Sequence, residues 1–240
     1  MRLILMPGMD GTGLLFEPFI RAWQTAAGPA ELQVMRYPDD QAWGYDALQR
    51  WLQGRLPRQE PLVLLGESFS GPLAVRLAAD PGLQIRGLIL CASFVQCPRP
   101  SLRAPAARLP ARLLTGRPSL ELAQRAILGT RADAGLRDLF AQALGQVSPE
   151  VLKTRLMAVM QLDPSIARHW ASLQRPTLSL CASRDWLVPA SASRALQRLR
   201  PGADLRWLPA PHGVLQTAPQ QAATAVADFV RGPATCAGRP

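Results

Sequence analysis

A serine in a sharp turn is the first residue in this sequence whose surroundings suit catalysis. Ser68 lies in Gly66-Glu67-Ser68-Phe69-Ser70-Gly71, which follows the apolar segment Leu62–Leu65 and precedes a helical pattern. A strand-to-helix turn of this kind exposes the serine hydroxyl and puts the next backbone N–H at a helix N-terminus. Gly66 and Ser70 are small enough to let strand and helix approach, although glycine is the usual residue at the second position. We predict that Ser68 is a nucleophile.

A serine hydroxyl needs a base to remove its proton before it attacks, and the chain has 2 histidines. His169 falls in a helical pattern and is expected to be an ordinary helix residue. His212 follows the segment Asp204–Leu208 and precedes the last helical pattern, where a loop at the carboxyl edge of a parallel sheet would present it. His212 is therefore the predicted base, and a surface loop histidine is the alternative.

A carboxylate that orients the imidazole would complete the set. Asp185 comes shortly after the apolar segment Thr177–Cys181, which favours it, and a cap for the following helix is the alternative interpretation. Asp133 and Asp163 fall in a helical region and are weaker candidates. In chain order the predicted catalytic residues are Ser68, Asp185 and His212.

A glycine-rich loop, Pro7-Gly8-Met9-Asp10-Gly11-Thr12-Gly13, follows the apolar segment Leu3–Met6. Glycines permit backbone angles that aim amide groups into a site. The loop lacks the Lys-Ser/Thr pair of a phosphate-binding P-loop, and its glycine spacing differs from the dinucleotide fingerprint. Beside a serine nucleophile it is better interpreted as an oxyanion loop, with the N–H groups of Met9 and Phe69 as predicted donors. Asp10 is expected to stabilise the turn.

Short apolar runs alternate with amphipathic stretches along the chain, which predicts an α/β fold with a doubly wound, mostly parallel sheet. Several runs are continuously apolar, as strands buried on both faces are. The predicted strands are Leu3–Met6, Leu32–Arg36, Leu62–Leu65, Gly87–Ala92, Thr177–Cys181 and Asp204–Leu208. The helices predicted between and after them are Phe16–Ala26, Tyr45–Leu56, Gly71–Ala79, Ala190–Leu199 and Gln220–Val230.

No strand is predicted between Phe94 and Arg175. Repeated prolines in residues 95–118 exclude a continuous helix there, and Ser148-Pro149-Glu150 is typical of a capped helix start. Three helical patterns follow the prolines, at Leu120–Leu128, Leu136–Leu144 and Val151–Leu162. We predict that residues 95–175 form a helical lid inserted into a core of residues 1–94 and 176–231. Residues 232–240 are rich in Gly and Pro and are expected to be a mobile tail.

Together these motifs resemble the α/β-hydrolase superfamily, in its small single-domain hydrolases with a helical lid. The resemblance covers the oxyanion loop, the turn around Ser68, the loops of Asp185 and His212 and the insertion, and so nearly the whole chain. It implies a site at the carboxyl ends of about six strands in the order 2-1-3-4-5-6, with the topological switch between the strands that carry Met9 and Ser68. The glycine-rich loop also resembles that of esterases and acyltransferases related to plant phytyl ester synthases.

Composition limits the other classes of protein. The chain has 240 residues, 48% of them hydrophobic, as in a packed globular protein. No apolar run approaches the roughly 18 residues needed to span a membrane, and Leu3–Met6 is too short for a secretory signal. The 4 cysteines show no Cys-x-x-Cys spacing, so we interpret them as reduced thiols of a cytoplasmic protein. No metal and no cofactor are expected.

The formal net charge of +10 raises the question of nucleic-acid, membrane or acidic-protein partners. Residues 95–175 have a net charge of +7 out of the total of +10. Residues 95–118 contain five arginines and no acid. Because no recognised module or aromatic-basic interleaving is present, nucleic-acid binding is not expected. A solvated, Arg-rich lid is the simplest interpretation. The alternative is that the lid recruits an anionic acyl donor, such as a thioester of coenzyme A or of an acidic acyl carrier.

These features predict a serine hydrolase that cleaves small-molecule carboxylic esters or thioesters through an acyl-enzyme. One alternative is an acyltransferase that uses the same three residues, with an alcohol in place of water. The other is a non-catalytic binding protein of the hydrolase fold, with the basic lid as its interaction surface. A complete Ser, Asp and His set disfavours the binding protein, which has no need of it.

Overall fold

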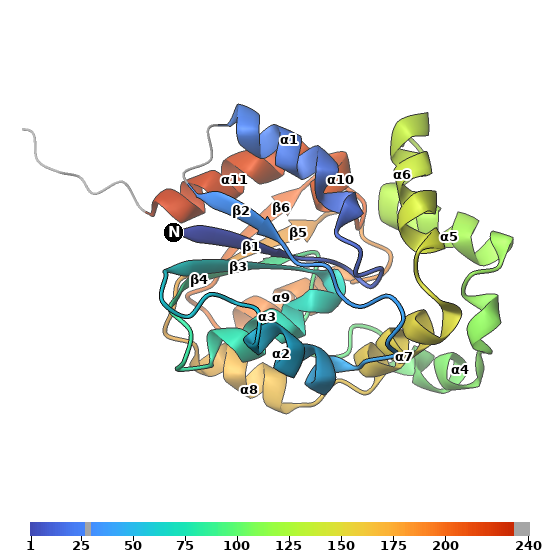
Figure 1. Cartoon of the computed structure of the whole chain (residues 1–240), viewed down its shortest axis with the longest axis horizontal. Helices are drawn as coiled ribbons and strands as arrows, with labels where there is room; N and C mark the ends of the chain where they lie inside the picture. Colours follow the sequence, from blue (N-terminus) through green and yellow to red (C-terminus); the bar gives the residue numbers. More distant parts are fainter. Residues whose placement is uncertain (27–29, 233–240) are drawn as a thin grey trace, which may run out of the picture.

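The computed structural model describes residues 1–26 and 30–232. Its centre is a sheet in which every neighbouring pair of strands is parallel, in the order β2-β1-β3-β4-β5-β6 (Figure 1). The strands are β1 (Arg2–Met6), β2 (Glu31–Val34), β3 (Leu62–Glu67), β4 (Ile85–Cys91), β5 (Thr177–Ala182) and β6 (Asp204–Leu208). The predicted parallel sheet and its strand order are confirmed.

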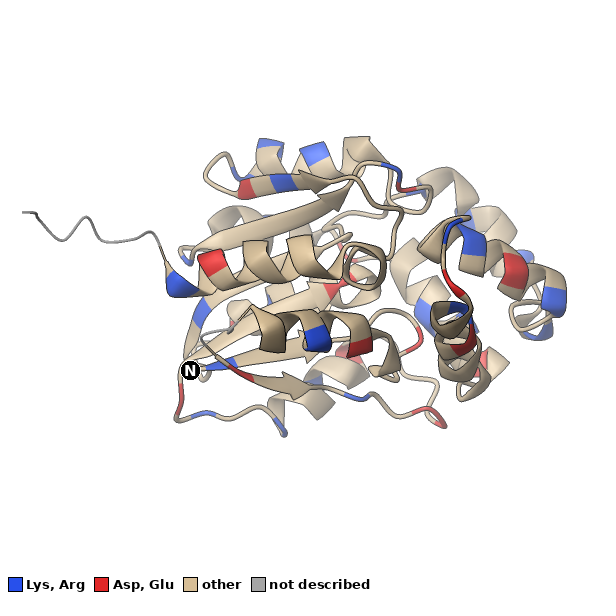
Figure 2. Ribbon diagram, turned by 90° about the horizontal axis from the view of Figure 1, so that it is seen from above, with Lys and Arg blue, Asp and Glu red and all other residues tan. Residues whose placement is uncertain are grey.

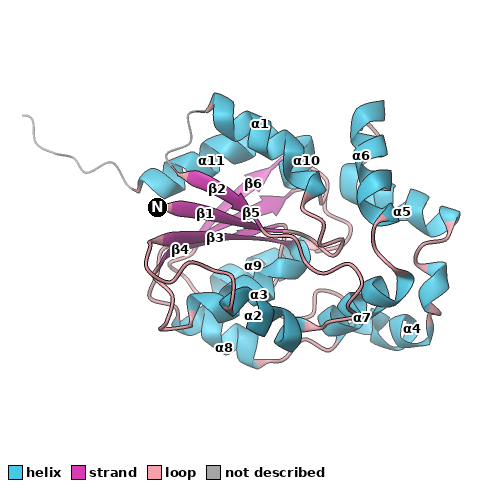
Figure 3. Ribbon diagram, in the orientation of Figure 1, coloured by secondary structure: helices cyan, strands magenta, loops and turns pink. Residues whose placement is uncertain are grey.

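Helices cover both faces of the sheet (Figures 1 and 3). One face carries α1 (Glu17–Thr25), α10 (Val214–Thr217) and α11 (Pro219–Arg231). The other carries α2 (Tyr45–Gln53), α3 (Gly71–Ala78), α8 (Ser165–Ser172) and α9 (Ala190–Leu199). This three-layer arrangement is the one that a mostly parallel sheet needs, because both of its faces are apolar.

The central strands contain continuous apolar runs, because successive side chains enter different cores. In β1, Leu3 and Leu5 belong to the buried cluster under α1 and α11. Ile4 and Met6 belong to the cluster under α2, α3, α8 and α9. Successive side chains of a strand point to opposite faces, so a continuous apolar run anchors the sheet to both helical layers. The carboxyl ends of β1 and β3 are thereby held in register.

Four helices between β4 and β5 lie beyond the carboxyl ends of the strands (Figure 1). They are α4 (Arg103–Arg108), α5 (Arg117–Leu128), α6 (Ala134–Gly145) and α7 (Pro149–Met160), and we call them the α4–α7 segment. The proline-rich stretch before α5 holds only the 6-residue helix α4 and short 3-10 turns. At the start of α7, the Ser148 hydroxyl accepts the Val151 N–H at 3.3 Å, so the expected cap is present.

Helix α8 also falls within residues 95–175, but it packs on the sheet. Trp170 is fully buried in the cluster that contains Leu88 and Leu90 of β4. Its indole N–H donates to the Leu196 carbonyl of α9 at 2.8 Å. Helix α8 therefore returns the chain from β4 to β5 as part of the helical layer. This packing favours an insertion that ends at α7, narrower than the predicted lid.

Within residues 1–26 and 30–232, no helix is long and apolar enough to cross a membrane. In the same part of the chain Cys91, Cys97 and Cys181 are free thiols. Cys236 and residues 233–240 of the predicted tail lie outside the described residues.

Candidate active site

Ser68 occupies a tight turn between β3 and α3. Its φ of 47° lies in the left-handed region that residues with a side chain rarely adopt. Close packing holds this backbone, because a Cβ added at Gly66 would come within 2.8 Å of the Ser70 carbonyl oxygen. The Ser93 hydroxyl, just after β4, donates to the Ser68 carbonyl at 2.6 Å. The turn therefore presents the Ser68 hydroxyl at the edge of the sheet in one orientation.

His212 lies between Ser68 and Asp185. Its Nε2 is 2.8 Å from the Ser68 Oγ, and its Nδ1 is 2.7 Å from the Asp185 Oδ2. The His212 and Asp185 side chains are buried, with 6% and 3% of their surfaces exposed. An ionised Asp185 accepts the Nδ1 proton, which leaves Nε2 free to accept the proton of Ser68. The arrangement therefore suits proton transfer from the serine hydroxyl to the imidazole.

Asp185 is itself fixed by its own loop after β5. Its Oδ1 accepts the N–H groups of Leu187 and Val188, both at 2.8 Å. The carboxylate therefore has one oxygen bound to the backbone and the other bound to His212. Hydrogen bonds of this kind orient a catalytic carboxylate and so orient the imidazole it holds.

The other polar candidates from the sequence lie elsewhere. His169 is exposed on α8. The Asp133 carboxylate caps α6 by accepting the Leu136 N–H at 2.8 Å. The Asp163 carboxylate accepts the Ser165 N–H at 2.7 Å, at the start of α8. Among residues 1–26 and 30–232, no group of three or more His, Cys, Asp and Glu side chains is arranged to hold a metal ion.

The two predicted oxyanion donors come from the loops that follow β1 and β3. Within the described residues, the Met9 N–H donates to no protein acceptor. The Phe69 carbonyl accepts the Tyr45 hydroxyl at 3.0 Å, and the two rings stack with centroids 4.7 Å apart. The residue that follows Ser68 is thus held from α2, through its carbonyl and its ring. The oxyanion role of Met9 and Phe69 stays a prediction.

Ser70, where the usual turn pattern has glycine, joins these two loops. Its hydroxyl donates to the Pro7 carbonyl of the glycine-rich loop, and it accepts the Tyr37 hydroxyl at 2.6 Å. Burial raises the pKa of Tyr37, so this phenol keeps its proton and remains a donor. The departure from glycine therefore gives a buried hydrogen bond between the turn of Ser68 and the loop of Met9. Sequence reasoning noticed Ser70 only for its small size.

Arg155 of α7 is a second residue that sequence reasoning missed. Its side chain is fully buried. The Nη1 group donates to the carbonyls of Met9 and Asp10 at 2.9 and 2.7 Å, and Nη2 donates to the Pro38 carbonyl at 2.8 Å. Gly11, with φ of 73°, packs directly on the guanidinium, where a Cβ would collide. The α4–α7 segment thus fixes the backbone of the glycine-rich loop.

The sequence contains a signal for Arg155 in the spacing of α7. Val151, Arg155 and Val159 lie four residues apart and are all buried. Side chains at this spacing share one face of a helix, so Arg155 is a cation on an apolar face. Such a residue is buried only with partners, which the three loop carbonyls provide.

Glu67 precedes Ser68 and is a buried acid beside the reacting groups. Its Oε1 accepts the Gln216 amide of α10 at 2.9 Å, and that amide also donates to the Leu15 carbonyl at 3.1 Å. Burial raises the pKa of Glu67 to about 7, partly offset by the Gln216 hydrogen bond. The Asp10 carboxylate raises the pKa further, and His212 lowers it. The Glu67 carboxyl therefore titrates near neutral pH, next to the turn of Ser68.

Comparison with known protein families identifies the family to which the chain belongs. A family model described as serine aminopeptidase S33, an α/β-hydrolase family, matches residues 45–210. The chain belongs to this α/β-hydrolase family. The match includes the turn of Ser68 and the loop of Asp185. The resemblance seen in the sequence is thereby confirmed, and the protein is a hydrolase by family.

Solved structures of other α/β hydrolases share the fold over most of their length. A carboxylesterase of Nitrososphaera gargenis superposes with a TM-score of 0.77 at 15% identity, over 96% of this chain and 89% of the other. An enol-lactonase of Burkholderia xenovorans LB400 gives 0.77 at 15%, over 96% and 91%. MenH of S. aureus gives 0.77 at 16%, over 96% and 93%. No curated protein sequence matches the chain. At these identities the likeness establishes the fold alone.

The raised pKa of Glu67 predicts a pH-dependent stability. The folded protein binds a proton more tightly than the unfolded chain, so the free energy of unfolding falls as the pH rises from 4.5 to about 7. Glu67→Gln removes this effect and is expected to be more stable than wild type by about 3 kcal/mol at pH 8, with little difference at pH 4. Urea unfolding at pH 4, 6 and 8 measures the difference. Glu121→Gln, on an exposed carboxylate, is the control, and a gain that is constant with pH would contradict the prediction.

The contacts of Arg155 predict a positioning role for it. Arg155→Met leaves the Met9 and Asp10 carbonyls without their donor, so the glycine-rich loop shifts. We expect kcat on a neutral ester to fall by about 100-fold while KM changes less than threefold, with partial recovery in Arg155→Lys. Activities are compared well below each variant's melting temperature, beside the exposed-site control Arg108→Met. An unchanged kcat in a folded Arg155→Met protein would refute the role.

Proposed function

We propose that this α/β hydrolase is a serine hydrolase that cleaves carboxylic esters or thioesters through an acyl-enzyme. The observation that carries the proposal is the pair of hydrogen bonds that links Ser68 to His212 and His212 to Asp185. Each of the three residues follows a different strand of the sheet, as in other hydrolases of this fold. A histidine held in this way between a serine and a buried carboxylate is a general base aimed at one hydroxyl.

In the first half of the reaction, the Ser68 Oγ attacks the carbonyl carbon of the substrate. His212 Nε2 takes the hydroxyl proton, and the Asp185 carboxylate stabilises the resulting imidazolium. The carbonyl oxygen becomes an oxyanion, which accepts the N–H groups of Met9 and Phe69. When the tetrahedral intermediate collapses, His212 donates its proton to the departing alcohol or thiol. Ser68 then carries the acyl group.

In the second half, a water molecule replaces the leaving group. His212 Nε2 removes one proton from this water as its oxygen attacks the acyl carbonyl. The same N–H groups stabilise the second oxyanion. Collapse returns the proton to the Ser68 Oγ and releases the carboxylic acid. An alcohol that takes the place of water would give a new ester, so analysis of the product distinguishes hydrolysis from acyl transfer.

The names of the similar structures support an ester as the bond that is cleaved. A carboxylesterase and an enol-lactonase act on carboxylic esters, and both superpose on this chain over nearly its full length. The family description refers to an aminopeptidase. Amino-acid p-nitroanilides are therefore the matched test of peptidase activity beside p-nitrophenyl esters.

The α4–α7 segment is proposed to act as the lid over this site. Several of its charged side chains have structural partners: Arg103 donates to the Met160 carbonyl at 2.7 Å, and Arg117 pairs with Glu121 at 3.1 Å. Arg155 is buried against the glycine-rich loop. Figure 2 shows Lys and Arg on these helices interspersed with Asp and Glu. The high net charge of the segment is thus partly structural, which weakens the expectation of an acidic carrier or coenzyme A as partner.

Replacement of the three residues tests the proposed mechanism. Ser68→Ala is expected to abolish labelling by a fluorophosphonate probe, because the probe needs the activated hydroxyl. Ser68→Ala and His212→Ala are each expected to lower kcat on p-nitrophenyl butyrate by at least about 1,000-fold. Mass spectrometry of the labelled peptide and initial rates measure the two effects.

Matched variants are available for the controls. His169→Ala changes the other histidine and Ser191→Ala an exposed serine of α9, and both are expected to keep wild-type labelling and rates. Undiminished labelling or hydrolysis in folded Ser68→Ala would refute the proposed function. A series of p-nitrophenyl esters and acyl thioesters of increasing chain length then identifies the acyl group and the leaving group.

A further inference from the structure

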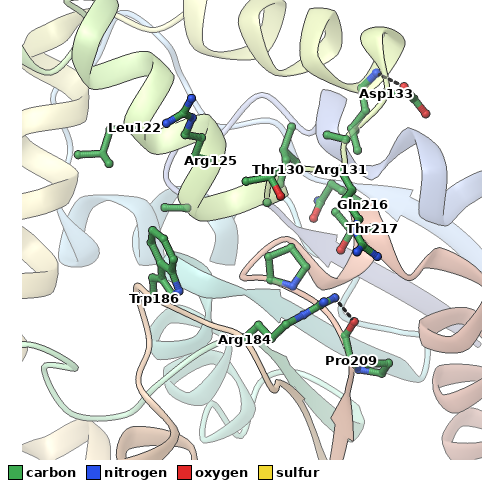
Figure 4. A pocket seen from close by; sticks show the side chains of 16 residues that line it. Leu122, Arg125, Thr130, Arg131, Asp133, Arg184, Trp186, Pro209, Gln216 and Thr217 are labelled. Atoms are coloured by element: carbon green, nitrogen blue, oxygen red, sulfur yellow. Dashed lines mark hydrogen bonds between the residues drawn. The ribbon is translucent and has the colours of Figure 1, made fainter.

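A cavity of about 720 Å³ lies between the α4–α7 segment and the loops that carry Asp185 and His212. One wall is α5 with the loop that joins it to α6. The opposite wall contains Arg184 and Trp186, which flank Asp185 (Figure 4). Pro211, which precedes His212, also lines the cavity. The volume is within the usual range for sites that bind small molecules. Ser68 and His212 do not line this cavity, so it is separate from the reacting atoms.

The charge of the cavity wall is positive. Arg125, Arg131 and Arg184 line it, and within the described residues none of them pairs with an acidic side chain. Asp133 is the only acid among the lining residues, and its carboxylate caps α6. Uncompensated guanidinium groups around a cavity attract carboxylate or phosphate groups, which they bind through charge-assisted hydrogen bonds.

Two large apolar side chains that line the same cavity are unusually exposed. Leu122 of α5 is 64% exposed, and Trp186 of the Asp185 loop is 67% exposed. Figure 4 draws Leu122 and Trp186 toward one end of the cavity and Arg131, Gln216 and Thr217 toward the other. Apolar surface that gathers at a cavity marks a ligand-binding surface. The wall therefore suits a ligand that has both an apolar part and an anionic group.

We propose that this cavity binds an amphiphilic organic anion, as the carboxylate- or phosphate-bearing part of the ester or thioester substrate. Arg131 and Arg184 bind the anionic group, Arg125 adds positive charge beside Leu122 (Figure 4), and Leu122 and Trp186 contact the apolar part. Because Arg184 and Trp186 flank Asp185, the bound group contacts the loop that orients His212. This assignment of a substrate class rests on the proposed function. The anionic group belongs either to the far end of the acyl chain or to the leaving group.

Binding to the inactive variant tests the cavity without any turnover. Octyl phosphate, octanoate and octanol are titrated into Ser68→Ala by calorimetry. We expect the two anions to bind at least tenfold more tightly than octanol. In the Ser68→Ala background, Arg125→Gln/Arg131→Gln/Arg184→Gln should bring the anions to within about twofold of octanol. Trp186→Ala should weaken all three ligands by a similar factor, because it removes only apolar contact.

A second triple variant controls for bulk charge. Arg108→Gln/Arg112→Gln/Arg198→Gln removes three exposed arginines that do not line the cavity, two of them from the α4–α7 segment and one from the core. It is expected to keep the preference for anions to within twofold. Equal binding of octanol and the anions, or an equal loss in the two triple variants, would overturn the proposal.

Kinetics on the active enzyme test the substrate part of the proposal and locate the anion. The mono-4-nitrophenyl ester of octanedioic acid carries the charge on the acyl chain, and butyryl-coenzyme A carries it on the leaving group. The cavity triple variant should lose at least tenfold in kcat/KM on one of these and less than twofold on neutral 4-nitrophenyl octanoate. Equal losses on charged and neutral substrates would refute the substrate assignment. Arginine-dependent binding without any esterase activity would instead refute the proposed function and leave the cavity as an anion site.

Discussion

The Ser70 hydroxyl joins the two loops on which the proposed chemistry depends. One loop follows β1 and carries Met9, and the other follows β3 and carries Ser68. The Ser70 hydroxyl donates to the Pro7 carbonyl and accepts the Tyr37 hydroxyl. These two buried hydrogen bonds connect the loop of Ser68 to the loop of Met9. Buried hydrogen bonds are costly to leave unmade, so this pair restricts where the loops can sit. The apolar strands fix the register of β1 against β3. Ser70 then fixes the two loops that follow these strands.

Arg155 of α7 adds a second constraint on the glycine-rich loop. Its guanidinium spans Met9, Asp10 and Pro38, so the backbone of the glycine-rich loop is held by a helix that the chain inserts between β4 and β5. The inserted helices therefore support the backbone of this loop. Removal of one buried charged partner leaves several unpaired groups, which makes this contact costly to lose.

The same region contains a charge that opposes stability. Glu67 is buried near Asp10 of the glycine-rich loop, and burial raises the pKa of Glu67 to about 7. An ionised Glu67 destabilises the folded chain, but its negative charge also stabilises an imidazolium at His212. Functional sites commonly retain groups that cost stability for such electrostatic reasons.

The sequence predicts the parts of this structure that depend on local pattern. Continuous apolar runs identified the central strands, and the residues after three strands identified Ser68, Asp185 and His212, which the structure brings within hydrogen-bonding distance. The α8 packing was missed, because the spacing of Trp170 is that of any amphipathic helix and its partner Leu196 is distant in the sequence.

The partners of Ser70 and Arg155 could not be predicted either. Both side chains bind backbone carbonyls of remote loops, and a carbonyl is common to every residue type. The spacing of α7 indicates that the Arg155 side chain is buried, but only the three-dimensional structure shows which carbonyls it binds. The cavity between α5 and the loop of Asp185 depends in the same way on segments far apart in the chain.

The central claim has two parts. His212 activates Ser68, and the oxyanion formed from the substrate carbonyl is bound by a loop whose position Ser70 and Arg155 fix. A crystal structure of the fluorophosphonate adduct tests it most directly. The account predicts phosphorus bonded to the Ser68 Oγ, with one phosphonyl oxygen about 2.7–3.1 Å from both the Met9 and Phe69 amide nitrogens. Arg155 should still contact the Met9 carbonyl. An adduct on another residue would contradict it. So would a phosphonyl oxygen that points to solvent while the Met9 N–H donates to a different acceptor.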